Sequence, residues 1–310
     1  MIDFRNLHAD RVPGRYNAEK APHKAVLLLA IIKLYENKKI NLEKIMFKDM
    51  YLLETYKDIW KCLDYKKLGP ISLPLFHLKT DGFYKIHFKV EKPFSPKGSL
   101  KKLLDQAERA EFNDEFVEIL SNEVLRKKEI EEILTGGHFT TKEISKVNAK
   151  LRLLDKSFEY EKILNDYPSK SFETKFVKDQ SKEYTKVRSG SFRRMILKFY
   201  NSTCAICRVS IIVEDISVID AAHILPFSEF CNDDPRNGIA LCKNHHWLFD
   251  NGGISISPEY RIKISNNIAK ETPEGVLSQY FRKKITLPND KILYPAKEAL
   301  EWHNFRWNFI

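Results

Sequence analysis

The amino-acid sequence predicts an α+β fold divided into two domains, and three observations lead to this prediction. The chain has 310 residues, which suits two ordinary domains better than one. Hydrophobic residues make up 43% of the chain and charged residues 30%, so both domains can form packed cores. A segment rich in Ser, Lys, Thr and Asp, residues 167–190, separates two halves that each mix helix and strand patterns. We therefore expect domains over 1–166 and 191–310, joined by a linker over 167–190.

The first domain is expected to combine helices with a β-hairpin. Residues 25–32 would be apolar on most sides of a helix, and they follow Pro22, which suits a first helical turn. Residues 71–78 alternate like a strand and residues 83–88 return as a second strand, with an Asp-Gly turn signal between them. Further helices are predicted over 42–63, 100–134 and 140–166.

The charge of the chain favours a polyanionic partner. Lys and Arg number 52 against 42 Asp and Glu, which gives a formal net charge of +10, and nucleic acid is the commonest partner of such basic proteins. No secretory signal is visible at the N-terminus, and the longest apolar run, residues 25–34, is too short to span a bilayer. We therefore expect a cytoplasmic protein with no membrane partner.

The cysteines indicate a metal site rather than a disulfide framework. The chain has five, an odd number, at scattered positions. Cys204 and Cys207 are separated by two residues, and Cys242 and His245 repeat that spacing. Two such pairs supply four ligands that Zn²⁺ prefers, so a structural zinc is expected. The alternative is that Cys204 and Cys207 are simply small buried residues.

A second group of polar residues has the chemistry of phosphodiester hydrolysis. This reaction needs a base that activates water and a cation that stabilises charge on the phosphate and the leaving oxygen. His223 follows a strand-like run and is a suitable base near neutral pH. His246 and Asp250 lie four residues apart on a predicted helix, so both can hold one divalent ion. Asn237 lies in a polar turn, where its amide can tie down the loop between two strands. Each residue alone has an ordinary structural explanation, but their order and their interleaving with the zinc ligands indicate a catalytic site.

The segment from about residue 191 to residue 250 resembles HNH endonucleases of bacterial restriction systems. The resemblance is carried by residues 221–224, Ala-Ala-His-Ile, and by residues 237–250, Asn-Gly-Ile-x-Leu-Cys-x-x-His-His-x-x-Phe-Asp. It implies a ββα-metal fold, in which two strands, a loop and a helix surround one ion. It also implies His223 as general base, Asn237 as loop organiser and His246 as metal ligand, with Asp250 in the second ligand position.

One departure from the family concerns the residue before the base. Many relatives have an Asp or His metal ligand where this chain has Ala222. Either the site uses fewer protein ligands and more water, or Asp220 contributes, although alternation along a strand would direct Asp220 away from His223. Mg²⁺ readily keeps several waters, and Mn²⁺ would also suit this site.

The N-terminal domain is similar to the sulfur-binding domain of bacterial restriction enzymes that attack phosphorothioate-modified DNA. Residues 21–29 and 73–84 carry this similarity, and the order of a reader domain before an HNH domain agrees with it. It implies an apolar cup for the sulfur and cations for the neighbouring phosphates. The residues that it places at the DNA are Arg15, His23, Lys24, Leu73, Pro74 and Phe76. The relatives usually have aromatic residues on both sides of the proline, where this chain has leucines, and the alternative is that residues 73–78 are a core strand.

Together these features predict a modification-dependent restriction endonuclease that cuts double-stranded DNA in antiviral defence. Two alternatives stay open, namely a sequence-specific nuclease that acts on unmodified DNA and a DNA-binding module that does not cleave. One HNH domain makes one nick, so a double-strand break suggests a homodimer or two encounters.

Overall fold

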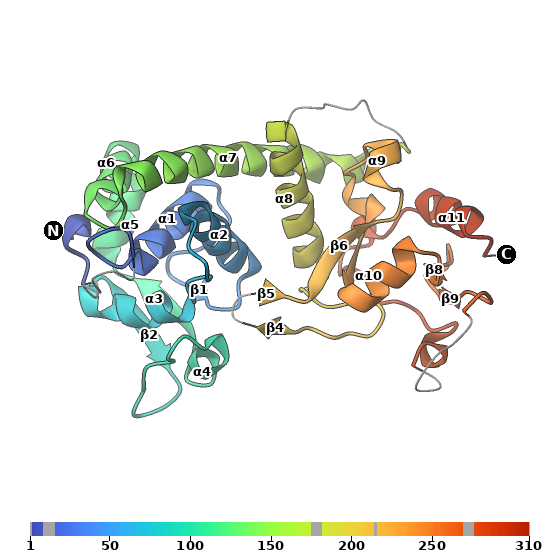
Figure 1. The fold of residues 1–310 in the computed structure, drawn as a ribbon, viewed down its shortest axis with the longest axis horizontal. Helices are drawn as coiled ribbons and strands as arrows, with labels where there is room; N and C mark the ends of the chain where they lie inside the picture. Colours follow the sequence, from blue (N-terminus) through green and yellow to red (C-terminus); the bar gives the residue numbers. More distant parts are fainter. Residues whose placement is uncertain (1, 9–15, 175–181, 214–215, 269–275, 310) are drawn as a thin grey trace. The chain divides into compact units, whose positions relative to one another are not determined.

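The computed structural model describes residues 2–8, 16–174, 182–213, 216–268 and 276–309. It divides the chain into two compact units, Met1–Asp155 and Lys156–Ile310, and each of them mixes helices with small antiparallel sheets (Figure 1). The predicted α+β fold is therefore confirmed. None of the helices formed by the described residues combines the length and the apolar character that crossing a membrane requires.

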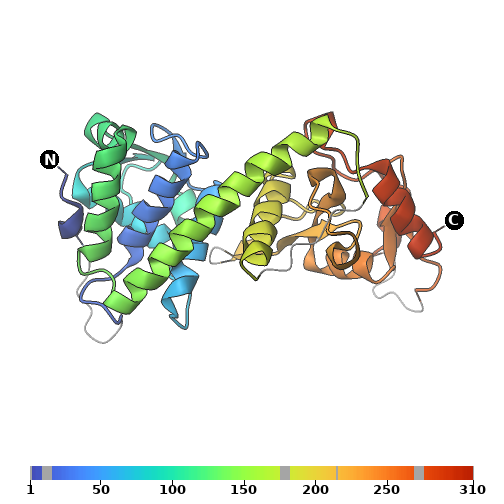
Figure 2. The ribbon, with the colours of Figure 1, turned by 90° about the horizontal axis from the view of Figure 1, so that it is seen from above.

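The first unit is built around one buried helix. Its helices and strands are α1 (His23–Glu36), α2 (Met50–Trp60), α3 (Ser72–His77), α4 (Leu100–Leu104), α5 (Asp114–Ser121), α6 (Glu123–Thr135), the first part of α7 (Thr141–Asp166), β1 (Ile45–Met46), β2 (Tyr84–Phe88) and β3 (Ala107–Phe112). Short 3-10 helices cover Phe4–Asn6, Lys61–Leu63 and Leu78–Asp81. The predicted apolar helix is α1, and it packs against α2, α3 and α6 (Figure 2). Because residues 24–32 of α1 are all buried, no side of this part of the helix faces solvent.

The predicted hairpin over residues 71–88 is wrong in its first half. Residues Ser72–His77 form α3, while the second half forms strand β2 as expected. Ile71, Leu75 and Leu78 are all fully buried, and their spacing of four and three residues fits one face of a helix. Pro74 is tolerated because it lies in the first turn of this short helix.

The partner of β2 is a strand in a segment that we expected to be helical. Strand β3 lies between β1 and β2 and pairs antiparallel with both. Ala107, Ala110 and Phe112 of β3 are buried, but charged residues alternate with them along the strand. These charged residues give residues 100–134 the composition of an exposed helix, which is why the sequence pattern hid the strand.

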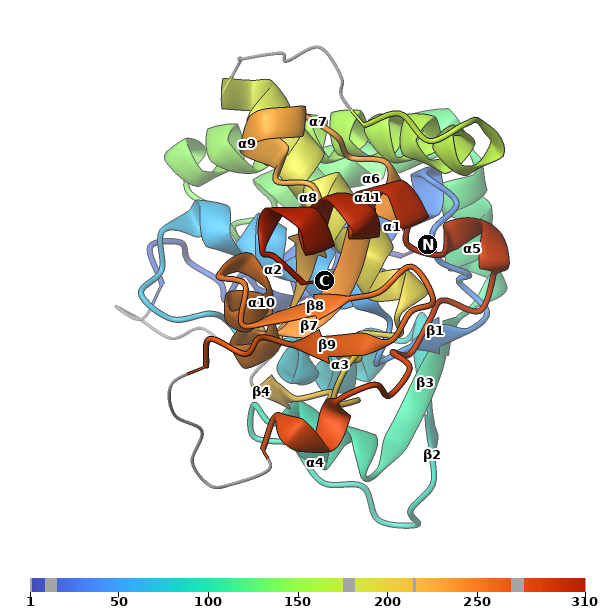
Figure 3. The ribbon, with the colours of Figure 1, turned by 90° about the vertical axis from the view of Figure 1, so that its right-hand side faces the viewer.

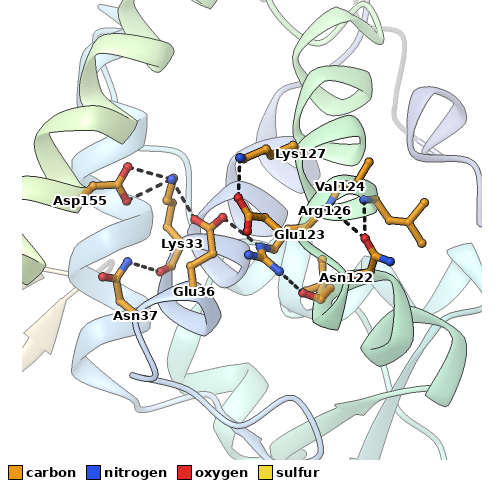
Figure 4. Close-up of polar contacts among 11 residues, drawn as sticks. Lys33, Glu36, Asn37, Asn122, Glu123, Val124, Arg126, Lys127 and Asp155 are labelled. Atoms are coloured by element: carbon orange, nitrogen blue, oxygen red, sulfur yellow. Dashed lines mark hydrogen bonds and ion pairs between the residues drawn. The ribbon is translucent and has the colours of Figure 1, made fainter.

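Ion pairs connect three helices of the first unit (Figure 4). The Lys33 ammonium on α1 lies 3.0 Å from both carboxylate oxygens of Asp155 on α7, and 2.9 Å from a carboxylate oxygen of Glu36. Arg126 on α6 donates from Nε to Glu36 at 3.0 Å. Burial lowers the pKa of Lys33, but the two carboxylates raise it by more than burial lowers it. This lysine therefore stays charged.

The second unit contains the end of α7 and four more helices with three two-stranded sheets in its described part. These are α8 (Lys182–Phe199), α9 (Phe227–Phe230), α10 (Lys243–Asp250), α11 (Lys297–Arg306), β4 (Ile212–Val213), β5 (Ile216–Ser217), β6 (Ile219–His223), β7 (Gly238–Cys242), β8 (Ile254–Ile256) and β9 (Ile262–Ile264). Short 3-10 helices cover Tyr167–Ser169, Pro235–Asn237, Ser278–Tyr280 and Lys291–Leu293. Helix α8 lies along β6 and β7, and α11 packs on β8 (Figures 1 and 3).

Part of the expected linker is a packed helix. Residues 182–190 form the first half of α8, whereas residues 175–181 lie outside the described residues. Val187 and Arg188 are buried, with exposed fractions of 8% each. The sequence pattern suggested a linker because the segment is polar, but its buried contacts stabilise it as a helix of the second unit.

Candidate active site

The four predicted zinc ligands converge on one point. Cys204 and Cys207 lie in the turn that follows α8, Cys242 ends β7, and His245 lies in the first turn of α10. The four ligand atoms all lie within 4.8 Å of one another. The Sγ atoms of Cys207 and Cys242 are 3.9 Å apart, which is close to the separation of about 3.8 Å expected for two thiolates on one tetrahedral zinc. The geometry therefore fits a structural zinc, which would fix the end of β7 to the start of α10.

The contacts of Cys204 favour the zinc-binding form of its thiol. Its Sγ lies 3.5 Å from Nδ1 of His245, and Cys242 Sγ lies 3.1 Å from the same nitrogen. Hydrogen bonds from Cys242 and His245 hold the pKa of Cys204 well below its usual range, although burial opposes this. The thiolate is the species that binds Zn²⁺.

Strands β6 and β7 and helix α10 form a ββα unit that carries the candidate catalytic residues. The two strands pair antiparallel, with His223 opposite Gly238, and α10 begins directly after β7. A Cβ atom at residue 238 would overlap the side chains of Ile196 and Phe192 on α8. Gly238 therefore lets α8 approach the strands closely enough for Phe192 to contact His223.

His223 is held between an aromatic ring and a carboxylate. Its ring stacks on Phe192 with a centroid distance of 3.9 Å and an interplanar angle of 9°. Its Nε2 lies 2.9 Å from Oδ1 of Asp233. Burial lowers the pKa of His223 below its ordinary value of 6.5, and this effect outweighs the opposing effect of Asp233. The imidazole is therefore neutral near pH 7, and a neutral imidazole can accept a proton from water.

The side chain of Asn237 is hydrogen-bonded to the loop between the two strands. Its side chain is fully buried, and its Oδ1 accepts a hydrogen bond from the backbone N–H of Leu225 at 2.8 Å. Its Nδ2 donates to the carbonyl oxygens of Leu225 at 3.1 Å and of Asn232 at 3.0 Å. Both ends of the loop that follows His223 are thus connected through one amide.

His246 and Asp250 lie on one face of α10 and offer a nitrogen and an oxygen to an ion. Nε2 of His246 is 3.3 Å from Oδ2 of Asp250. Two adjacent ligands of an octahedral Mg²⁺ or Mn²⁺ are separated by about 3.0 Å, so the pair fits such an ion with small adjustments. Asp250 is 55% exposed, which leaves room for water ligands.

Asp220 lies on the other side of His246 and is paired with cations. Its carboxylate contacts Arg193 on α8 and Lys243 on α10, and one of its oxygens lies 3.8 Å from Nδ1 of His246. Burial raises the pKa of Asp220, but the neighbouring His246, Lys243 and Arg193 lower it more. Because Asp220 faces Nδ1 and Asp250 faces Nε2, the geometry suits Asp220 as a group that orients His246.

The sequence did not single out several residues that surround His223. Asp233 was seen only as part of the polar turn before Asn237, and a sequence pattern of that kind does not distinguish it from its neighbour Asp234. Arg188, which donates to Asp233 at 2.7 Å, lies in the segment that was expected to be a linker. Phe192 is the second residue after that segment and carried no polar signal.

The candidate DNA contacts of the first unit are brought together only in part. Leu73 is half-buried, while Pro74 and Phe76 are buried, and all three lie on α3. His23 begins α1 and packs against Trp60 and Tyr16, with ring-centroid distances of 4.6 and 5.4 Å. Arg15 lies outside the described residues.

Lys24 does not present a free charge. It is 6% exposed, and its ammonium donates to Asp81 at 2.6 Å and to Thr80 at 3.0 Å. The structure therefore gives no support to Lys24 as a phosphate contact. A cation that the sequence did not single out, Lys79, has its ammonium 3.7 Å from the centre of the Phe76 ring.

A comparison with protein families agrees with the ββα geometry. Residues 204–257 match the model of the HNH endonuclease family. A solved structure of a modification-dependent TagI restriction endonuclease is similar with a TM-score of 0.31 and 19% identity, over 42% of this chain and 44% of that one. This chain thus matches less than half the length of that protein, and no curated protein matches it. The family match and the ββα geometry together identify residues 204–257 as an HNH endonuclease domain.

Proposed function

We propose that this protein is a metal-dependent restriction endonuclease that hydrolyses the backbone of modified double-stranded DNA. One arrangement carries the catalytic part, namely that β6, which ends at His223, packs against α10, which carries His246 and Asp250. This arrangement supplies the base and the cation site that phosphodiester hydrolysis requires.

The side chains divide the reaction between them. His223 takes a proton from the attacking water, and Asn237 keeps the loop after His223 in place. His246 and Asp250 would hold Mg²⁺ or Mn²⁺, which stabilises negative charge on the phosphate and the leaving oxygen. The resemblance to HNH enzymes implies 5′-phosphate and 3′-hydroxyl products. Zinc at the Cys3His cluster would hold the ββα unit together and would take no part in the reaction.

The finer part of the proposal is that the first unit recognises phosphorothioate. Sulfur is softer and less hydrated than the oxygen that it replaces, so an apolar surface with a nearby cation favours it. The candidate residues are Leu73, Pro74 and Phe76 on α3, of which Leu73 is half-buried and the other two are buried, with Lys79 as the cation. This proposal rests on the sequence resemblance and on that cluster.

A cleavage assay on two plasmids of identical sequence, one phosphorothioate-modified and one unmodified, tests both parts. We expect cleavage of the modified plasmid alone, in the presence of Mg²⁺ or Mn²⁺. Equal cleavage of both plasmids at fixed sites would support the nuclease proposal but contradict recognition of phosphorothioate. It would instead indicate that the protein recognises an unmodified DNA sequence. Binding without cleavage of either plasmid would contradict the nuclease. If the product is a linear plasmid, a homodimer is expected, and a concentration-dependent mass measurement would detect it.

A further inference from the structure

A buried polar network lies behind the base. Asp233 is 2% exposed, and its Oδ1 lies 2.9 Å from Nε2 of His223. The same oxygen accepts a hydrogen bond from Nη1 of Arg188 at 2.7 Å, and Oδ2 accepts one from the hydroxyl of Tyr160 at 3.1 Å. The three partners offset the free-energy cost of burying this carboxylate and leave it little freedom to move.

The partners of Asp233 come from different elements of the second unit. Tyr160 lies on α7 and Arg188 on α8, whereas Asp233 belongs to the loop between β6 and β7. The guanidinium of Arg188 is itself held, because it stacks over the Phe227 ring at 3.3 Å. Phe192 covers one face of the His223 ring at 3.9 Å. The stacking on Phe192 therefore fixes the plane of the His223 ring, and the hydrogen bond with Asp233 fixes the position of Nε2.

We propose that Asp233 is a positioning residue that keeps a proton on Nε2 of His223 and so leaves Nδ1 as the atom that accepts the proton of the attacking water. An ionised carboxylate can only accept hydrogen bonds, so Nε2 must donate to it. A neutral imidazole has one N–H group, and Nδ1 is then a free acceptor. This inference rests on the proposed nuclease function and names the atom that acts in it.

The network also suits the charge that develops during the reaction. As the water oxygen forms its bond to phosphorus, its proton moves to Nδ1, and the bond between phosphorus and the 3′-oxygen breaks. The leaving oxygen keeps the electron pair of that bond and takes a proton from solvent. His223 is then an imidazolium whose positive charge lies beside Asp233, and it returns the proton from Nδ1 to solvent.

The competing explanation is that Asp233 only stabilises the fold as an ion pair with Arg188. The neighbouring residue provides a matched control for it. Asp234 is also 2% exposed, and its carboxylate binds Arg236 at 2.7 Å and 3.0 Å, but none of its bonds reaches His223. Asp233→Asn and Asp234→Asn therefore remove the same charge from equally buried positions, and only the first change affects the base.

The experiment compares these two variants with the wild-type full chain. Asp233→Asn keeps the shape of the side chain, and its amide oxygen can still accept from Arg188 and His223. We expect its single-turnover cleavage rate on a plasmid that the wild type cuts to fall about 10- to 100-fold, with unchanged DNA affinity, because the charge beside the imidazolium is lost. For Asp234→Asn we expect a rate within about threefold of the wild type. Equal losses in both variants, or none in Asp233→Asn, would overturn the proposal.

A spectroscopic measurement tests the inference without cleavage. Nitrogen-15 NMR of the histidine rings distinguishes the two neutral tautomers, and His223→Gln identifies the signal of interest by its disappearance. We expect the proton of His223 on Nε2 in the wild type at neutral pH. A proton on Nδ1 would overturn the inference even if the protein cleaves DNA. The Nε2 tautomer in a protein that cuts no plasmid would instead contradict the nuclease proposal alone.

Discussion

Asn237→Asp is the substitution that most sharply tests how the active-site loop is held. The change keeps the size of the side chain and its acceptor for the N–H of Leu225. It replaces the donating Nδ2 with an oxygen that faces two carbonyl oxygens, at 3.0 and 3.1 Å, in a fully buried position. Each lost hydrogen bond costs about 1 kcal/mol, and leaving its buried partner unpaired adds to this. We therefore expect the free energy of unfolding of the second unit to fall by about 3–5 kcal/mol at pH 7.

Urea denaturation with zinc present measures this loss. Tryptophan fluorescence reports mainly on the second unit, which contains three of the four tryptophans, Trp247, Trp302 and Trp307. Burial raises the pKa of the new carboxyl group above its unfolded value, and a group of this kind contributes stability at low pH that is lost as pH rises. The destabilisation should therefore be smaller at pH 5 than at pH 7.

A second asparagine provides the control. The Nδ2 of Asn304 on α11 donates to the carbonyl oxygens of Ile256 and Leu300 at 2.7 and 2.6 Å, and the side chain is 7% exposed. Asn304→Asp should destabilise the same unit by a similar amount but leave the cleavage rate of the folded fraction unchanged. Asn237→Asp should lower both quantities. A loss of less than about 1 kcal/mol in Asn237→Asp would refute the account of the loop.

Three further predictions follow from contacts in the two units. Cys204→Ser, or treatment with a strong chelator, should remove bound zinc and unfold the second unit. Metal analysis and circular dichroism would detect these two changes. Retention of both the zinc and the structure would contradict the zinc site. Burial lowers the pKa of His303 to about 4, so the second unit should lose up to about 3 kcal/mol as pH falls from 6.5 to 4. His303→Gln should flatten this pH dependence in urea titrations, and an unchanged slope would exclude His303 as its cause. Lys24→Met should lower the thermal stability of the first unit, because Asp81 loses its buried partner. DNA affinity should change little. A large loss of DNA affinity in a folded variant would instead indicate that Lys24 contacts DNA.

The candidate site of the second unit was predictable because its candidate ligands and its candidate base lie in short, ordered motifs. The zinc residues come in two pairs with the same spacing, and His223, Asn237 and His246 follow the strand, loop and helix in sequence. Local spacing therefore translated directly into positions in the ββα unit. The network around Asp233 was not predictable, because Tyr160 and Arg188 are 73 and 45 residues away along the chain and reach it only after folding.

The fold of the first unit was predictable where one pattern dominated. Helix α1 is apolar on most sides, so its burial could be expected from its composition. Residues 71–78 fit two patterns, since alternate positions are apolar and so are positions four and three residues apart. The structure contains the helix rather than the strand, and the helix buries Ile71, Leu75 and Leu78 in the core. Strand β3 was not predicted, because the charged exposed residues along it concealed the apolar residues of its buried face.

The most direct test of the central claim compares the wild type with His223→Ala in a single-turnover plasmid cleavage assay with Mn²⁺. His223 is stacked on Phe192 and bonded to Asp233, so DNA affinity and zinc content should be measured on both proteins to confirm that the domain stays folded. We predict that the wild type cleaves and that His223→Ala binds the same DNA but cleaves about 100- to 10,000-fold more slowly. Cleavage by His223→Ala at the wild-type rate would contradict the assignment of His223 as the base.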